Sequence, residues 1–199
     1  IRPAATVMLV DDRPDLQVLM LRRSARQVFA GDMWVYPGGA VDPDDAGEAA
    51  PYCVGLDDEA ASARLGLASG GLAYWVAAIR ECFEEAGVLF ARDDVGSSAW
   101  HDPTRAAELE AARQALNAHQ VAFLDIVRQF GLVLDAGRLH YVGHWITPLG
   151  SPRRFDTRFF LAGFPTGQVA AHDDSEAVHH EWLAPEQAVG RWRADAMAM

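Results

Sequence analysis

The chain has 199 residues, of which 50% are hydrophobic and 23% charged, and this suits a single globular domain with a sizeable core. Its formal net charge is −11 and its pI is near 4.9, which argues against a nucleic-acid partner because such a surface repels a polyanionic backbone. No apolar run reaches membrane-spanning length, so we expect no membrane partner. The two cysteines, Cys53 and Cys82, provide no disulfide framework, and we expect a reducing, cytoplasmic setting.

The first forty residues predict a small β-sheet that leads into a glycine pair. Residues 5–10 and 16–22 are strand-like and flank a turn rich in Asp, which predicts a hairpin. Residues 29–36 predict a further short strand before Gly38 and Gly39. Glycines there let a ligand approach the main chain, so the pair is a candidate for substrate binding. An ordinary tight turn is the alternative.

The most informative stretch is a predicted helix that ends at Gly87. Its apolar stripe recurs at three- and four-residue steps and comprises Trp75, Ile79, Cys82, Phe83 and Ala86. The opposite face carries Arg80, Glu81, Glu84 and Glu85. Like charges at these spacings repel one another, so the cluster favours a bound cation, and carboxylate oxygens suit a hard divalent ion. The alternative is a solvated acidic face on an amphipathic helix.

Other helices are predicted on either side of this one. Residues 58–67 predict a short helix inside a segment rich in Asp, Ala and Gly. Asp102 and Pro103 are a favourable start for a helix over residues 104–118, and a second helix over residues 121–130 follows. We expect the last two to form an inserted helical hairpin that covers one flank of the site. Residues 88–90 between them and the acidic helix predict a short strand.

The C-terminal third predicts strands over residues 139–147, 154–161 and 181–183, with a helix starting at Pro185. Trp145 and Phe155 are expected in the core rather than stacked on a nucleobase. Residues 167–180 form a polar, acidic loop. The histidines in this region match no common metal-site spacing, and we expect them to be surface residues: His172, His179 and His180.

Arginines in two places are candidates for contact with a substrate phosphate, because a guanidinium fork matches that geometry. Arg154 and Arg158 lie on one strand, where pairing with Asp156 is the alternative. Three more follow the second predicted strand and are either an anion-contacting edge or a solvated loop: Arg22, Arg23 and Arg26.

Two of these stretches resemble a known family. Residues 80–88, Arg-Glu-Cys-Phe-Glu-Glu-Ala-Gly-Val, resemble the second half of the Nudix box, and residues 36–39, Tyr-Pro-Gly-Gly, resemble its lead-in. Residues 145–148 and 154–160, with the later Glu176 and Trp182, resemble the coenzyme A diphosphatase branch of that family. The resemblance implies one Nudix domain over residues 1–199, an α/β/α sandwich with a mixed sheet, with insertions at about 43–72 and 92–135.

The chain departs from the family pattern at one position. Leu72 stands where the uninterrupted box has its first glutamate, eight residues before Arg80. We therefore expect a different partner to orient Arg80, and Asp42 is the candidate because it lies three residues past Gly39.

The resemblance implies a hydrolase that cleaves the diphosphate linkage of a small nucleotide compound, with coenzyme A or acyl-CoA as the leading substrate. Mg²⁺ or Mn²⁺ would neutralise the diphosphate and activate water. The expected ligands are Glu81, Glu84 and Glu85. The expected catalytic residues are Arg80, Glu84, Glu85 and Glu176, with Asp174 as a second choice of general base. The alternatives are an ADP-ribose or NADH pyrophosphatase and a non-catalytic nucleotide-binding regulator. Oligomeric state stays open, and a homodimer is common among such proteins.

Overall fold

A computed structural model describes residues 1–25, 31–93, 96, 100 and 102–199 of the chain. The main sheet runs through the middle of the molecule in the order β10-β2-β1-β9-β8, with β3 paired to β2 and β4 paired to β1. The bounds are β1 Arg2–Asp11, β2 Gln17–Arg23, β3 Trp34–Val35, β4 Gly38–Ala40, β8 His140–Ile146, β9 Phe155–Gly163 and β10 Ala177–Leu183. β1 and β9 pair in parallel and the other pairs are antiparallel, so the sheet is mixed.

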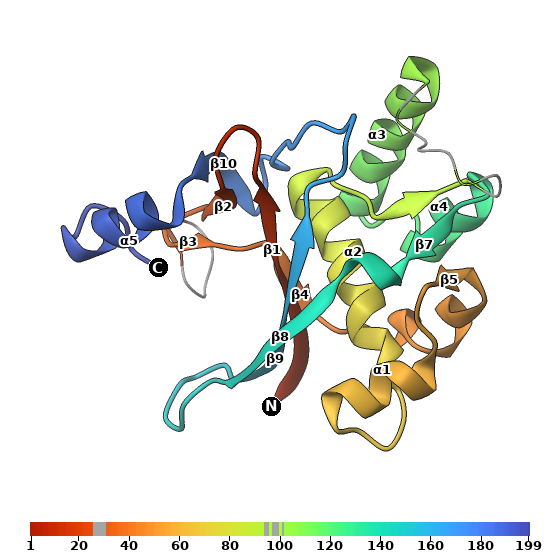
Figure 1. Cartoon of the computed structure of the whole chain (residues 1–199). Helices are drawn as coiled ribbons and strands as arrows, with labels where there is room; N and C mark the ends of the chain where they lie inside the picture. Colours follow the sequence, from red (N-terminus) through yellow and green to blue (C-terminus); the bar gives the residue numbers. More distant parts are fainter. Residues whose placement is uncertain (26–30, 94–95, 97–99, 101) are drawn as a thin grey trace.

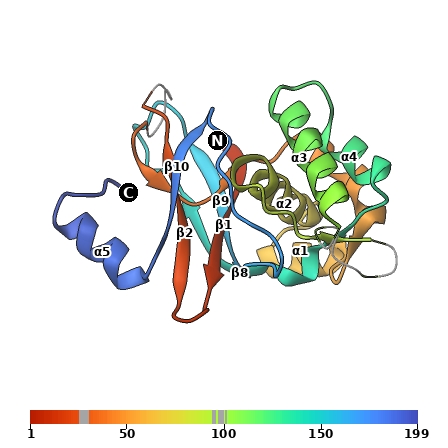
Figure 2. The ribbon, with the colours of Figure 1, turned by 90° about the horizontal axis from the view of Figure 1, so that it is seen from above.

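Helices cover both faces of this sheet (Figures 1 and 2). One face carries the long helix α2, with α1, α3 and α4 outside it, and the other face carries α5. The bounds are α1 Asp58–Leu65, α2 Leu72–Ala86, α3 Pro103–Asn117, α4 Phe123–Gln129 and α5 Pro185–Arg193. Two separate hydrophobic clusters fill the two sides, a large one around α2 and a small one that includes Met20 and Ala188. The predicted α/β/α sandwich with a mixed sheet is therefore confirmed.

The smaller elements lie beside α2, away from the main sheet. A three-stranded sheet has the order β5-β7-β6, with β5 at Cys53–Val54, β6 at Ala91–Arg92 and β7 at Val133–Asp135. Three turns of 3-10 helix complete the described chain: η1 Pro43–Asp45, η2 Gly47–Tyr52 and η4 Ala136–Arg138. The first of these turns places an aspartate against α2, as described below.

Helix α2 is buried on nearly all sides. Its apolar stripe packs on the sheet, where the ring centroids of Trp75 and Phe160 are 4.7 Å apart. The indole N–H of Trp75 also donates to the carbonyl of Leu139. The polar face is buried as well, because Glu81 is only 8% exposed and Glu85 only 7%. The alternative of a solvated acidic face is therefore wrong. Gly87 ends the helix in the left-handed conformation, with φ of +67°.

The two helices predicted after α2 form as a pair. Asp102 caps α3 by accepting the N–H of Thr104, and α4 ends shortly before Gly131, which has φ of +56°.

Residues 88–90 are buried but form no strand, since pairing begins only at Ala91. Trp145 is 69% exposed on β8, so its expected place in the core is wrong. Among the helices of the described ranges, none is long and apolar enough to cross a membrane.

Candidate active site

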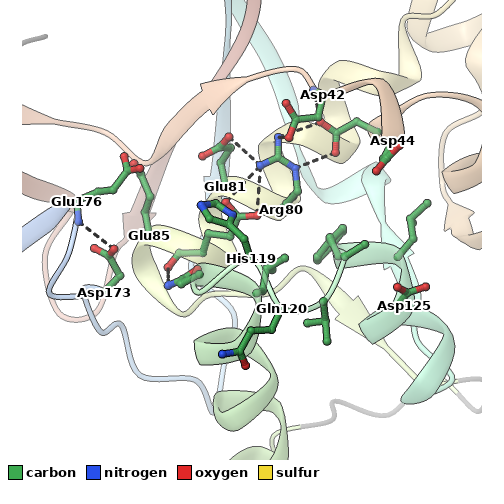
Figure 3. Close-up of a pocket in the computed structure, with 18 of the residues that line it drawn as sticks. Asp42, Asp44, Arg80, Glu81, Glu85, His119, Gln120, Asp125, Asp173 and Glu176 are labelled. Atoms are coloured by element: carbon green, nitrogen blue, oxygen red, sulfur yellow. Dashed lines mark hydrogen bonds and ion pairs between the residues drawn. The ribbon is translucent and has the colours of Figure 1, made fainter. Parts of the chain in front are cut away.

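A cavity of about 490 Å³ opens beside the C-terminal half of α2 (Figure 3). Three groups of residues surround it: the polar face of α2 with η1, the link between α3 and α4, and the loop before β10. Its acidic lining is Asp42, Asp44, Asp45, Glu81, Glu84, Glu85, Asp125, Asp173 and Glu176. Four of the residues predicted for the site, Arg80, Glu81, Glu84 and Glu85, thus face one cavity with Glu176.

Arg80 is the centre of the acidic face. Its Nε and one terminal nitrogen each donate to a carboxylate oxygen of Asp45 at 2.9 Å, in a bidentate pair. The other terminal nitrogen donates to Glu81 at 2.9 Å and to Glu84 at 3.3 Å. A further bond runs to the carbonyl of Ala40 at 2.8 Å. The guanidinium therefore ties α2 to β4 and η1 and fixes the orientation of two of the glutamates.

The partner of Arg80 is Asp45 rather than Asp42. The Asp42 carboxylate is 3.7 Å from Arg80 and its side chain is 59% exposed, whereas Asp45 is only 3% exposed. Asp45 reaches this position because Pro43 starts the turn η1, and its second oxygen also accepts the N–H of Asp42 at 2.8 Å. Leu72 lies in the core at the start of α2. The sequence signal for Asp45 was the Asp-Pro-Asp-Asp run, which is typical of such a turn.

The glycine pair of β4 is shaped around the carboxylates. Gly38 donates its N–H to Glu85 at 2.9 Å. A Cβ on Gly39 would lie 2.4 Å from a carboxylate oxygen of Glu81, so only glycine leaves room for that side chain. A Cβ on Gly38 would lie 2.5 Å from the carbonyl of Ala5 on β1. The pair therefore positions Glu81 and Glu85, and direct contact with a substrate stays a prediction.

Burial raises the pKa values of four carboxyl groups around Arg80, which belong to Asp45, Glu81, Glu84 and Glu85. It raises the pKa of Glu81 to about 8, against the opposing effect of Arg80, and the neighbouring Glu84 charge adds to the rise. Burial also raises the pKa of Glu85 well above its ordinary range, and repulsion from Glu81 adds to it. The pKa values of Glu84 and Asp45 rise for the same first reason. Burial thus makes the ionised form of these acids less favourable than it is in water.

The cluster has more carboxylates than basic partners. Asp45, Glu81 and Glu84 share the guanidinium of Arg80, while Glu85 accepts the N–H of Gly38. All-oxygen donors facing a cavity fit a hard divalent cation. Within the described part of the chain, however, no three His, Cys, Asp or Glu side chains already converge as a ligand set. The residues thus fit such an ion by donor type and charge.

The loop before β10 brings Glu176 to the cavity and leaves Asp174 outside it. Asp173 organises the loop by accepting the N–H groups of Glu176 at 3.0 Å and Ala177 at 2.8 Å. Arg23 lies 3.5 Å from the Glu176 carboxylate. The Asp174 side chain is 86% exposed and contacts His172 at 3.0 Å. Of the two predicted candidates for general base, the geometry therefore favours Glu176.

The other arginines predicted to contact phosphate lie away from the cavity lining. Arg158 pairs with Asp156 and lies over the ring of Tyr74, and Arg154 donates to the carbonyl of Thr147 at 3.0 Å. Arg22 pairs with Asp32 at 2.7 Å. Arg26 falls outside the described residues. Contact of any of these with a phosphate stays a prediction.

The three histidines gather beside the acidic loop. The Nδ1 atoms of His172 and His180 are 2.7 Å apart, and the ring of His179 lies edge-on to Trp34. All three are exposed or half-buried.

The side chains of one cavity wall, between α3 and α4, were not predicted individually from the sequence. The last residue of α3, Asn117, and the α3–α4 link with His119, Gln120 and Val121 form this wall. In Figure 3 the ring of His119 points toward Glu81 and Arg80, whereas Gln120 points away. His119 has φ of +55°, which is uncommon for a residue other than glycine. The helical pair was expected to cover a flank of the site, but no local pattern singles out these side chains.

The chain is similar to known proteins over most of its length. A model of the NUDT19 Nudix domain matches residues 57–199. The chain is 31% identical over 240 residues to the acyl-coenzyme A diphosphatase NUDT19 of Gallus gallus, covering 97% of this chain and 63% of that protein. It is 28% identical to the Homo sapiens protein of the same name, covering 86% and 54%. The chain thus spans less than two thirds of the length of these relatives.

A solved structure shows the same arrangement. The crystal structure of a NUDIX hydrolase from Alicyclobacillus acidocaldarius is 30% identical and superposes with a TM-score of 0.72. The match covers 98% of this chain and 83% of that one.

Proposed function

The chain belongs to the Nudix hydrolase family, in the group defined by the NUDT19 Nudix domain, and on this basis we propose that it cleaves the diphosphate linkage of coenzyme A or an acyl-CoA. The observation that carries the proposal is a group of buried or half-buried carboxylates that faces one cavity beside Arg80, namely Glu81, Glu84 and Glu85 on α2 and Asp45 on η1. A diphosphate and its counter-cations would fill such a cavity with complementary charge.

The residues that would hold Mg²⁺ or Mn²⁺ are Glu81, Glu84 and Glu85. Such a cation, when bound, supplies neutralisation of the diphosphate and a lower pKa for an attacking water. Burial raises the pKa values of these three acids, and the positive charge of the cation would oppose that rise. Buried carboxylates without that charge would be costly to keep ionised.

The remaining groups position the acids and move a proton. Arg80, held by Asp45, keeps Glu81 and Glu84 directed to the cavity. Gly38 holds one oxygen of Glu85 through its N–H. Glu176 enters from the loop before β10, next to Glu85, and is the acceptor for the proton of the attacking water (Figure 3). Its place on a loop rather than on α2 puts the proton acceptor and the cation ligands on different elements.

The choice of substrate is supported by the relatives, because the curated proteins from Gallus gallus and Homo sapiens are named acyl-coenzyme A diphosphatases. The cavity itself supports a polyanionic substrate that arrives with divalent cations. The helical wall from α3 and α4 adds polar and apolar side chains, which suits a substrate with a large non-phosphate part.

A substrate panel with product masses tests the proposal. Coenzyme A, an acyl-CoA, ADP-ribose and NADH are each incubated with Mg²⁺ or Mn²⁺. We expect hydrolysis of the first two to phosphopantetheine-containing products and adenosine 3′,5′-bisphosphate. Comparable rates on ADP-ribose with none on either coenzyme A compound would reject the substrate assignment.

A variant pair separates catalysis from mere binding. Glu85→Gln should lower the rate by at least 100-fold, which corresponds to about 2.7 kcal/mol in the barrier. Its melting temperature should be unchanged or higher, because Gln resembles the protonated acid that burial already favours. Glu108→Gln, an exposed acid on α3, is the matched control. Absence of hydrolysis in the wild-type chain on every substrate would instead favour a nucleotide-binding regulator.

A further inference from the structure

The C-terminal end of α2 is held by the inserted helix α3. A helix leaves its last carbonyl groups without partners inside the helix. Here the carbonyl of Glu84 accepts two bonds, from Nε of Arg113 at 3.1 Å and from Nδ2 of Asn117 at 3.1 Å. These two residues lie four positions apart, on one face of α3. The insertion therefore supplies the missing partners at the catalytic end of α2.

Arg113 also reaches a third segment. One terminal nitrogen donates to the carbonyl of Ala171 at 2.7 Å, and the N–H of Ala171 donates to the carbonyl of Ala86 at 2.9 Å. The other terminal nitrogen donates to Glu110 at 3.1 Å. One guanidinium thus joins α2, α3 and the segment that precedes β10.

The burial of Arg113 shows that this junction is built rather than incidental. Arg113 is only 2% exposed, whereas arginine is rarely so buried unless its donors are paired. Its carboxylate partner, Glu110, has a side chain that is 46% exposed. The guanidinium lies at the negative end of the α2 dipole, where a cation is favourable. A Cβ on Gly87 would lie 3.2 Å from a terminal nitrogen of Arg113, so the chain turns tightly around the guanidinium at the end of α2.

Two of the three joined segments, α2 and the one before β10, carry groups of the proposed reaction. Glu84 and Glu85 are on α2, and Glu176 follows Ala171 by five residues. Between them, Asp173 accepts the N–H groups of Glu176 and Ala177 and so holds the turn that contains Glu176. Arg113 is absent from the lining of the cavity, so it can act only through the groups that it holds.

We infer that Arg113, assisted by Asn117, is a positioning residue that sets the distance between the acids on α2 and Glu176. This inference rests on the proposed function and adds a role for the insertion. The insertion thereby becomes part of the catalytic apparatus instead of a cover over it.

Arg113→Lys and Arg113→Gln are the test variants. Lysine keeps the charge, but its single ammonium group cannot reproduce the fork that reaches Glu84 and Ala171 together. We expect kcat on the active substrate to fall by about 10- to 100-fold, with KM changed by less than about threefold, as misplacement of reacting groups produces. Asn117→Ala removes one of the two bonds to Glu84 and should lower kcat by a smaller factor. If the Arg113 variants do not fold, Asn117→Ala tests the inference in their place.

Arg105→Gln is the matched control. Arg105 is on the same helix and also donates to a main-chain carbonyl, that of Phe130, but this bond ties α3 to the end of α4 and not to α2. It should lower the melting temperature while leaving kcat within about twofold of wild type. Equal loss of kcat in Arg105→Gln and Arg113→Gln, or wild-type kcat in Arg113→Lys and Arg113→Gln, would overturn the inference.

A second readout needs no turnover and keeps this inference separate from the proposed function. Mn²⁺ affinity, measured by electron paramagnetic resonance of the free ion, should be at least about fivefold weaker in Arg113→Gln than in wild type and unchanged in Arg105→Gln. If wild type hydrolyses nothing, the proposed function fails and the Mn²⁺ measurement still decides the role of Arg113. Unchanged Mn²⁺ affinity in Arg113→Gln would then reject that role.

Discussion

The substitution Asp45→Ala gives the sharpest test of the site. It removes a carboxylate that is only 3% exposed and that makes two bonds of 2.9 Å to Arg80. Breaking a buried ion pair by deleting one partner costs about 3 to 5 kcal/mol. We expect the lower end of that range, because Arg80 keeps its bonds to Glu81 and to the carbonyl of Ala40.

The assay is reversible unfolding in urea followed by circular dichroism, with a thermal melt alongside. A loss of about 3 kcal/mol corresponds to a fall in melting temperature of roughly 6 to 12 °C for a domain of this size. Hydrolysis should fall as well, since Glu81 and Glu84 lose the fixed orientation of their common partner.

Asp42→Asn is the control, because the side chain of Asp42 is 59% exposed and lies 3.7 Å from the guanidinium. Its free energy of unfolding should stay within about 0.5 kcal/mol of wild type, as for most exposed sites. If Asp42→Asn proved as destabilising as Asp45→Ala, the assignment of Asp45 as the partner of Arg80 would be refuted.

Two further predictions concern the same cluster. The pKa of Glu81 is raised from 4.5 to about 8. Between about pH 4.5 and pH 8 the folded chain therefore keeps a proton that the unfolded chain loses. Because the folded state binds more protons in this pH range, the free energy of unfolding should fall as the pH rises through it. Added Mg²⁺ should raise the melting temperature more at pH 8 than at pH 5, and a shift that is equal at both pH values, or that survives in Glu81→Gln, would contradict this. Gly39→Ala should lower kcat with a small loss of stability, because its Cβ would push aside the carboxylate at the end of the Glu81 side chain. Gly38→Ala should mainly lower stability, because its Cβ would clash with the main chain of β1. Melting curves and initial rates for the two variants check this, and the opposite assignment of effects would show it to be wrong.

Much of the framework could be predicted from local pattern. The four- and three-residue spacing of Trp75, Ile79 and Cys82 predicted α2 as a helix with its apolar stripe on the core, and the Asp102 cap predicted the start of α3. The sheet followed from strand-like runs and turns, and the family resemblance supplied its mixed topology. These features depend on residues close together in the sequence, where periodicity and capping chemistry act directly.

The features that escaped prediction depend on tertiary contacts. Asp45 meets Arg80 from 35 positions away, and no local pattern ranks it above Asp42. Burial of Glu81 and Glu85 arises because η1 and the α3–α4 link close over a face that looks amphipathic in isolation. Trp145 is exposed because β8 is an edge strand of the described sheet, so its outer side chains have few neighbours. The buried run at residues 88–90 shows that an apolar segment need not be a strand.

The bond between Asp45 and Arg80 has a consequence for how such chains are recognised. Each of the two side chains is anchored by its own element, η1 after β4 and the middle of α2, so their bond does not require a fixed length for the segment that joins them in sequence. A search with fixed spacing between the glycine pair and the Arg-Glu run will pass over proteins built in this way. A search that allows a variable gap, and asks for an aspartate in a short turn after the glycines, should recover them.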